Sequence, residues 1–215
     1  MRPEIPDLEN HDSSQFEMMN EMCLVVDIDD NVTGSESKLI CHKNEGIRHR
    51  AFSVLIFDSK GRLLVQKRSP EKITFPGVWA NTCCSHPLGI GAEDDGIDGV
   101  RDAAIRKLEQ ELGISNEISS NWTFHHIGRI EYSCRWDKDW IEREIDHIMV
   151  VCADAVVNHN VNEISDVLWA DSTEVKRMMK GDGEWSNEVI APWFRLIWEK
   201  FAIPYDCNPS AISSV

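Results

Sequence analysis

The sequence predicts a single mixed α/β domain with a mixed sheet. Three observations favour this class: strand-like and helix-like segments alternate, strand-like runs are the more numerous, and no linker rich in Gly, Ser or Pro separates them. A length of 215 residues suits one core. We place the folded domain at residues 18–201, between a flexible, acidic N-terminal arm (1–17) and a C-terminal tail (202–215).

The first strands are expected at residues 22–28, 51–58 and 62–68. The first of these runs is apolar and β-branched, and a turn-forming Asp-Asp-Asn follows it. The other two runs flank Ser59-Lys60-Gly61, which is a signal for a hairpin turn.

A central amphipathic helix is predicted over residues 98–112, where apolar residues recur every fourth position and Gly113 stands at the expected C-cap. Glu111 falls on the apolar side of this helix at about 100° per residue. A carboxylate in that place needs a partner. Either a metal ion or Lys107, four residues earlier, would serve.

Further strand-like runs occupy 122–134, 143–152 and 164–170. Asp171 then starts a short helix, because the Ser-Thr-Glu that follows it provides capping-box chemistry. Residues 187–201 are amphipathic and predict a last helix, in which Pro192 either produces a kink or marks the first turn.

The net charge and the cysteines indicate which kinds of partner and which cellular compartment to expect. A net charge of −15 argues against broad binding of nucleic acid or of an anionic membrane, and the longest apolar stretches are too short to span a bilayer. Seven cysteines without an apolar signal segment indicate free thiols in a reducing compartment. We therefore expect a cytoplasmic protein; a peroxisomal location stays open, although the sequence ends without the usual tripeptide.

Histidines and glutamates form a candidate metal-binding set. His42 and His49 are seven residues apart, and His86 lies in Cys-Cys-Ser-His-Pro. Glu142 and Glu144 are two residues apart at the start of a strand, so both carboxylates project from one sheet face. Such mixed N/O donors suit Mn²⁺, Zn²⁺ or Mg²⁺. The ordinary alternative is a set of unrelated core histidines and solvated carboxylates.

Basic residues form two islands in this acidic chain: Lys38, His42, Lys43, Arg48 and Arg50 in the first, and Lys67, Arg68 and Lys72 in the second. Such islands suit a polyphosphate, and each also fits a solvated strand edge. Trp193, beside Pro192 among apolar neighbours, fits packing better than function. From the residues alone, the type of reaction stays open.

Several motifs follow one another over residues 18–200: Cys41-His42, His49-Arg50-Ala51-Phe52-Ser53, Arg68, Lys72-Ile73-Thr74-Phe75-Pro76-Gly77, Asn81-Thr82-Cys83-Cys84-Ser85-His86-Pro87, Glu111-Leu112-Gly113, Tyr132, Glu142-Arg143-Glu144 and Ala191-Pro192-Trp193. Their order and spacing resemble type I isopentenyl-diphosphate Δ-isomerase. The double cysteine resembles the eukaryotic branch of that family.

The resemblance implies a Nudix-type α/β/α sandwich that isomerises isopentenyl diphosphate to dimethylallyl diphosphate in isoprenoid biosynthesis. The reaction protonates an unactivated alkene to a tertiary carbocation and removes a different proton, so it needs two proton-transfer groups on opposite faces of the substrate, with water excluded. By resemblance these groups are Cys84 and Glu144, with Tyr132 assisting at the glutamate side. Trp193 would present its ring face to the cation.

The resemblance also implies two ions and a diphosphate site. The metal ligands carried over are His42, His49, His86, Glu142 and Glu144, and a second ion, Mg²⁺, would bridge Glu111 to the diphosphate. The diphosphate-binding residues carried over are Lys38, Arg68 and Lys72, with a further contact from Ser85. The implied partner is a small-molecule isoprenoid diphosphate, without nucleic acid or membrane, and the family favours a monomer.

Three other functions compete with the isomerase. The sequences of Nudix hydrolases follow the pattern G-x₅-E-x₇-R-E-U-x-E-E-x-G-U. This chain has Lys107 and Gln110 at two of the glutamate positions of that pattern, so Glu111 is one well-placed carboxylate that remains. A catalytically inactive metal-binding relative would lack a proton-transfer residue, and all are present. A structural zinc site at the double cysteine would need ligands at finger-like spacing that the sequence lacks.

Overall fold

The computed structural model describes residues 12–89, 91–202 and 213–214. Nine strands form one mixed sheet: β1 (Met22–Val26), β2 (Val32–Ser37), β3 (His49–Phe57), β4 (Leu63–Arg68), β5 (Trp79–Ala80), β6 (Cys83–Ser85), β7 (His125–Arg135), β8 (Ile141–Cys152) and β9 (Ile164–Ala170). In this sheet β3 pairs parallel with β8 and antiparallel with β1, β4 and β6.

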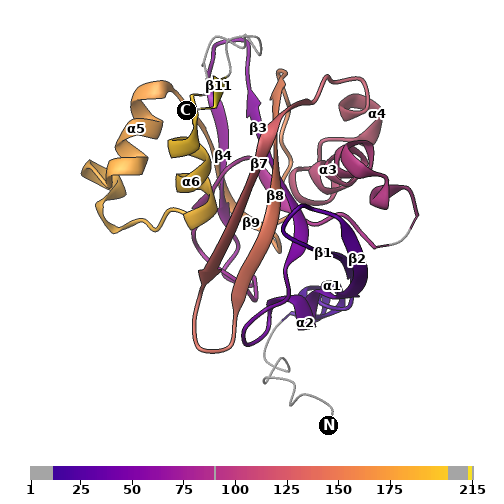
Figure 1. Cartoon of the computed structure of the whole chain (residues 1–215). Helices are drawn as coiled ribbons and strands as arrows, with labels where there is room; N and C mark the ends of the chain where they lie inside the picture. The colour runs from indigo at the N-terminus through magenta and orange to yellow at the C-terminus, as the bar shows by residue number, and fades with distance from the viewer. Residues whose placement is uncertain (1–11, 90, 203–212, 215) are drawn as a thin grey trace.

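The helices are α1 (Ser13–Met18), α2 (Lys38–His42), α3 (Gly96–Leu112), α4 (Asn116–Ser119), α5 (Ser172–Lys180) and α6 (Pro192–Lys200), with 3-10 turns at Gly91–Asp94 and Gly183–Asn187. Figure 1 shows α3 and α4 on one side of the sheet and α5 and α6 on the other. The predicted α/β/α sandwich is therefore confirmed. Among the described residues, no helix combines the length and the apolarity that a bilayer crossing requires.

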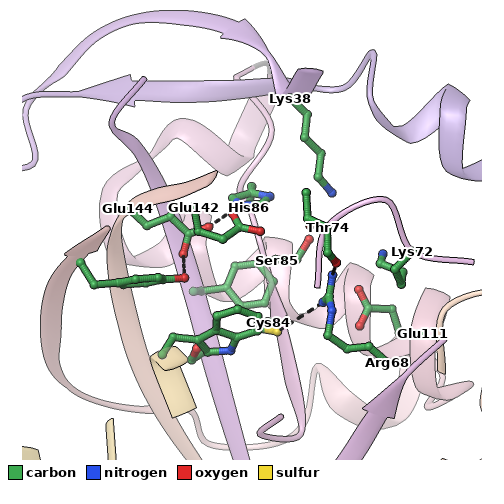
Figure 2. Close-up of a pocket in the computed structure, with 14 residues that line it drawn as sticks. Lys38, Arg68, Lys72, Thr74, Cys84, Ser85, His86, Glu111, Glu142 and Glu144 are labelled. Atoms are coloured by element: carbon green, nitrogen blue, oxygen red, sulfur yellow. Dashed lines mark hydrogen bonds and ion pairs between the residues drawn. The ribbon is translucent and has the colours of Figure 1, made fainter. Parts of the chain in front are cut away.

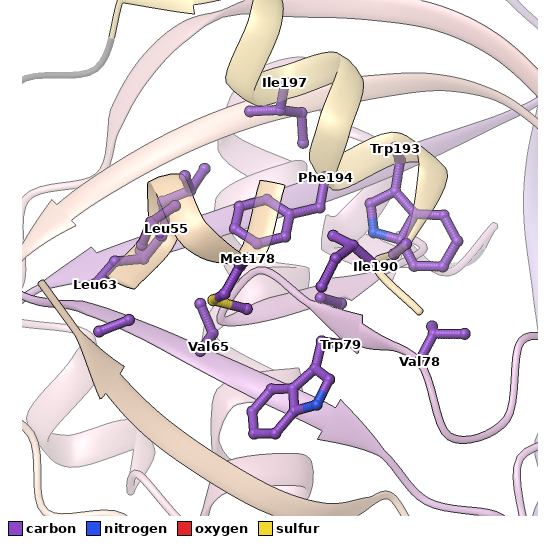
Figure 3. Packing of buried hydrophobic residues seen from close by; sticks show 14 of the residues in the cluster. Leu55, Leu63, Val65, Val78, Trp79, Met178, Ile190, Trp193, Phe194 and Ile197 are labelled. Atoms are coloured by element: carbon purple, nitrogen blue, oxygen red, sulfur yellow. The ribbon is translucent and has the colours of Figure 1, made fainter. Parts of the chain in front are cut away.

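Two apolar cores lie on the two faces of the sheet, and β3 contributes to both because its side chains alternate. Leu55 and Phe57 pack with Trp193 and Phe194 of α6, in the core shown in Figure 3. Phe52, Val54 and Ile56 pack against α3 instead. Burial on both faces explains why this strand reads as a continuous apolar run.

Most predicted elements are confirmed. The hairpin pairs Phe57 with Leu63, and α3 ends at Gly113, whose φ of 67° is the left-handed conformation that glycine adopts readily. Asp171 caps α5 by accepting hydrogen bonds from the amides of the next turn.

The structure corrects the last helix. Residues 188–191, which the sequence assigned to it, are not helical, because Ile190 pairs with Trp79 as an extended segment, and Asn187 ends the preceding 3-10 turn. Pro192 occupies the first turn of α6 and produces no kink.

The ends of the chain also differ from the expectation. Residues 1–11 of the predicted arm and 203–212 of the predicted tail lie outside the described residues. Residues 13–17, predicted as part of the flexible arm, belong to α1, where the Ser14 amide donates a capping hydrogen bond to Oδ1 of Asp12. Ala202 of the predicted tail pairs with Ser213 in a short second sheet, formed by β10 (Phe201–Ala202) and β11 (Ser213–Ser214).

Candidate active site

The side chains that the sequence singled out gather in one pocket (Figure 2) and in the ligand cluster beside it, which is formed by His42, His49, His86, Glu142 and Glu144. The space between the lining atoms of the pocket, counted to its open mouth, is about 430 Å³. The predicted residues in its lining are Lys38, Arg68, Lys72, Cys84, Ser85, His86, Glu111, Tyr132, Glu142, Glu144 and Trp193. His42 and His49 complete the ligand cluster.

The register of the sheet assembles the ligand cluster. The parallel pairing of β3 with β8 puts His49 beside Glu144, and Glu142 lies two residues earlier on the same face. His86 directly follows β6, which also pairs with β3, and α2 supplies His42. All five side chains are buried, and their ligand atoms lie within 4.8 Å of one another.

Backbone carbonyl groups fix two of the imidazoles. Nδ1 of His42 lies 2.7 Å from the Lys38 carbonyl oxygen, and Nδ1 of His49 lies 2.7 Å from that of Ile47. Because a carbonyl oxygen only accepts, each Nδ1 carries the proton, and each Nε2 presents a lone pair when the ring is neutral. This is the tautomer that a metal ligand needs.

The unpaired atoms of the cluster fit a divalent cation. Nε2 of His42 and Oε2 of Glu142 lie 2.7 Å apart, yet neither makes a hydrogen bond, and Nε2 of His49 makes none either. Buried polar atoms without partners are costly. Three imidazoles and two carboxylates that converge in this way form a donor set for a metal ion.

The electrostatics of the cluster agree with that assignment. Burial opposes ionisation of Glu142 and Glu144, but the neighbouring histidines outweigh it and the pKa of each carboxyl falls below its usual value. Burial and the other two imidazoles push the pKa of His86 well below 6.5, so this ring is neutral. Glu144 raises the pKa of His49 to about 9 in spite of burial. The two carboxylates thus attract a positive charge, and without a metal a proton on His49 supplies it.

Glu144 connects the ligand cluster to the pocket. One of its oxygens, Oε1, lies 2.7 Å from Nε2 of His86 and 3.5 Å from Nε2 of His49. The other, Oε2, accepts a hydrogen bond from the Tyr132 hydroxyl. Burial raises the pKa of Tyr132 well above 10, and the Glu144 charge adds to this effect, so the phenol keeps its proton.

The two adjacent cysteines lie on opposite faces of β6. Cys84 lines the pocket, whereas Cys83 belongs to the core under α3, with its Sγ 3.7 Å from Oε2 of Glu111. Burial raises the pKa of the Cys84 thiol to about 12, and the charge of Arg68 partly opposes this shift. Thiols on opposite faces cannot bind one ion together with His86, which argues against the structural zinc site.

A strained turn holds Arg68. Its Nε and Nη2 donate to the carbonyl oxygens of Phe75 and Thr74 at 2.9 and 2.8 Å. Phe75 has a φ of 49°, which is rare for a bulky residue and indicates local strain. The turn thereby fixes the guanidinium 4.0 Å from the sulfur of Cys84 (Figure 2) and with its Cζ 5.8 Å from the centroid of the Trp193 ring.

The sequence offered two partners for Glu111, namely Lys107 and a metal ion, and its position in the structure is compatible with both. Lys107, itself buried, lies 3.1 Å from Oε1 of Glu111, which is the i,i+4 ion pair. Glu111 also lines the pocket. Trp193 likewise combines packing with a place in the lining, and its Nε1 donates to Oδ1 of Asn81 at 3.2 Å.

One residue near the site was missed by sequence reasoning. Glu163 accepts a hydrogen bond from Lys72 Nζ at 2.7 Å, and it lies in no pattern that marks it, because its partner is far away in the chain. Asn81 lies in the motif with the double cysteine but was given no role; its side chain accepts the hydrogen bond that orients Trp193. Trp136 packs on Phe75 at 5.1 Å between ring centroids and lies outside the pocket lining.

Comparison with known proteins adds a family and a fold. The chain matches the NUDIX domain family over residues 47–194. It is 43% identical over 199 residues to the isopentenyl-diphosphate delta-isomerase IDI1 of Gibberella zeae (88% of this chain, 77% of the relative). To isopentenyl-diphosphate delta-isomerase 1 of Mesocricetus auratus it is 40% identical over 210 residues (94% and 91%).

Two solved structures share the fold. DR0079 from Deinococcus radiodurans superposes with a TM-score of 0.58 at 17% identity, over 83% of this chain and 98% of that one. A NUDIX hydrolase from Alicyclobacillus acidocaldarius gives a TM-score of 0.52 at 11% identity, over 75% and 92%. At these identities the similarity concerns the fold alone.

Proposed function

The chain belongs to the isopentenyl-diphosphate delta-isomerase family within the NUDIX domain family, and on this premise we propose which of its residues carry out the reaction. The protein isomerises isopentenyl diphosphate to dimethylallyl diphosphate, a step of isoprenoid biosynthesis. One observation supports our assignment above all others: a thiol, a carboxylate and an indole ring line the same pocket, beside a cluster of basic residues.

The isomerisation moves two protons. A proton adds to the terminal carbon of the alkene, positive charge develops at the tertiary carbon, and a proton leaves the carbon next to it on the diphosphate side. We assign these transfers to Cys84 and Glu144. Burial raises the pKa of the Cys84 thiol to about 12. In spite of burial, the hydrogen bonds from His49 and Tyr132 hold the pKa of Glu144 below its usual value, which supports a protonated thiol and an ionised carboxylate in the resting protein. Because the reaction is reversible, each group donates in one direction and accepts in the other.

Tyr132 and Trp193 support the charged states. The Tyr132 hydroxyl donates to Glu144 and so stabilises its ionised form. The ring of Trp193 offers its π face to the carbocation, an interaction worth about 2 kcal/mol when water is excluded. The buried lining also keeps water from trapping the cation as an alcohol.

The basic residues bind the diphosphate. Lys38, Arg68 and Lys72 bring three positive charges to the pocket, and Ser85 adds a hydroxyl. This local excess answers how a chain of net charge −15 holds an anionic substrate. A Mg²⁺ ion would be held by Glu111 together with the substrate, since Mg²⁺ commonly uses one carboxylate and phosphate oxygens.

The ligand cluster would hold the other divalent metal through His42, His49, His86, Glu142 and Glu144. When bound, that ion supplies positive charge beside Glu144, which tunes the acidity of this carboxylate. The identity of the ion (Mn²⁺, Zn²⁺ or Mg²⁺), the monomeric state and the cytoplasmic location stay predictions.

Proton NMR of the purified protein with isopentenyl diphosphate and Mg²⁺ in D₂O tests the assignment of the reaction. We expect dimethylallyl signals with deuterium incorporated into the carbon skeleton. Release of phosphate or isopentenyl monophosphate would move the protein to the hydrolases. An unchanged spectrum from metal-loaded, reduced protein would identify an inactive relative.

A further inference from the structure

The segment Ser13–Glu21, which contains α1, lies against the elements that carry the basic residues; we call it the N-terminal strap. Carbonyl oxygens of the strap accept hydrogen bonds from the first amides of α2: Glu21 from Lys38 at 2.7 Å and Met19 from Leu39 at 2.9 Å. Met19 also packs with Ile73, the neighbour of Lys72. Figure 1 shows α1 and α2 close together.

One side chain of the strap is buried and polar. Gln15 is 3% exposed, although the residues on either side of it in α1 are exposed. Its Nε2 lies 2.6 Å from Oε1 of Glu163 and 2.7 Å from Oδ1 of Asn162. Because the amide nitrogen only donates, it fixes the Glu163 carboxylate from the side of the strap.

Glu163 in turn holds Lys72. Its second oxygen, Oε2, lies 2.7 Å from Nζ of Lys72, and both side chains are at least nine-tenths buried. Lys72 also lines the pocket. An ammonium group has three donors, so one can bond Glu163 while two remain for a ligand. Gln15, Glu163 and Lys72 therefore form a chain of contacts from the strap to the substrate site.

Lys72 needs this partner because burial disfavours its charge. The pKa of Lys72 falls to about 8, chiefly because of burial; the charges of Glu163 and Glu111 oppose this shift, and those of Arg68 and Lys38 add to it. Glu163 is the carboxylate within hydrogen-bond distance. It both sustains the ammonium and limits the rotamers of a long side chain.

We propose that Gln15 and Glu163 are positioning residues that hold the Lys72 ammonium in place for the substrate diphosphate, which makes the N-terminal strap part of the substrate site. The inference rests on the proposed function, because it takes Lys72 as a diphosphate ligand. It predicts that substitutions at positions 15 and 163, each 50 residues or more from Lys72 in the sequence, weaken binding of the diphosphate and leave proton transfer intact.

Steady-state kinetics and inhibition by inorganic pyrophosphate with Mg²⁺ test the inference. In Gln15→Ala and Glu163→Gln, we expect the KM for isopentenyl diphosphate and the inhibition constant of pyrophosphate to rise by about tenfold, with kcat within about twofold. Glu17→Ala is the matched control, because Glu17 lies exposed on the same helix. It should behave as the wild type in both measurements.

A double-mutant cycle separates positioning from general destabilisation. If Gln15 acts through Lys72, adding Gln15→Ala to Lys72→Met should cause no further rise in KM. An unchanged KM in both single variants, or the same fold-rise with and without Lys72, would overturn the inference. If Gln15→Ala does not fold, the isosteric variant Glu163→Gln replaces it in both measurements. A wild type without turnover would instead refute the proposed function.

Discussion

Tyr132 and Glu144 are direct partners in the antiparallel pairing of β7 with β8, and the Tyr132 hydroxyl donates a hydrogen bond to Oε2 of Glu144. The opposite oxygen of the same carboxylate faces His86. The carboxylate is thus held from two sides, by a phenol in the pocket and by imidazoles of the ligand cluster. The ladder fixes this arrangement, because side chains of directly opposed residues lie about 5 Å apart at Cβ.

Tyr132→Phe should lower kcat by about 10- to 100-fold and change KM little. The substitution removes the hydrogen bond to Glu144 and keeps the ring, so the packing persists. Steady-state kinetics, with circular dichroism as a check of the fold, measure this. A kcat within twofold of the wild type would show that the hydroxyl takes no part.

Cys84→Ala should reduce turnover by at least about 10³-fold, because one of two proton-transfer groups is lost. Cys83→Ala is the matched control on the opposite face of β6. It should keep most activity and lose about 1 kcal/mol of stability from the small cavity. If Cys83→Ala were inactive and Cys84→Ala active, the assignment of the thiol would be wrong.

His86→Ala should lose both the bound metal and the activity, since an incomplete donor set binds metal weakly. His125→Ala is the control, because His125 lies on β7 and outside the ligand cluster. Elemental analysis of the purified variants gives the metal content. Full occupancy in His86→Ala would contradict the ligand set.

The stability of the protein should depend on Glu163 in acid. Burial raises the pKa of Glu163, but the charges of Lys72 and Lys107 outweigh this and lower it from 4.5 to about 2. A lowered pKa in the folded state contributes stability that is complete above pH 4.5 and is lost as the pH falls toward 2. The full contribution is about 3 kcal/mol.

Urea unfolding between pH 6 and pH 3 measures this dependence. The free energy of unfolding of the wild type should decline more steeply below about pH 4.5 than that of Glu163→Gln. Parallel curves for the two proteins would show that Glu163 has no lowered pKa in the folded state.

The sequence predicts those parts of the fold and site that depend on near neighbours. The helix α3 follows from its apolar period and from Gly113, and the pair of Lys107 with Glu111 follows from helical spacing. Glu142 and Glu144 share a face because they are two residues apart in one strand. Local geometry is sufficient in each case.

Features that depend on distant partners could not be predicted in this way. The amphipathic pattern before Pro192 suggested helix, but the backbone of Ile190 pairs with Trp79 across the fold. The short helix α1 has no strong period, and it is stabilised through Gln15 by residues near position 163. A single sequence does not indicate which distant segments will meet.

The parallel pairing of β3 with β8 also orders events during synthesis of the chain. His42, His49 and His86 leave the ribosome well before Glu142 and Glu144. At translation rates of about 5–20 residues per second, the interval between His86 and Glu144 is roughly 3 to 12 s. During that interval a nascent chain offers imidazoles without carboxylates. The complete donor set of the ligand cluster therefore exists only after β8 has been made and has paired with β3.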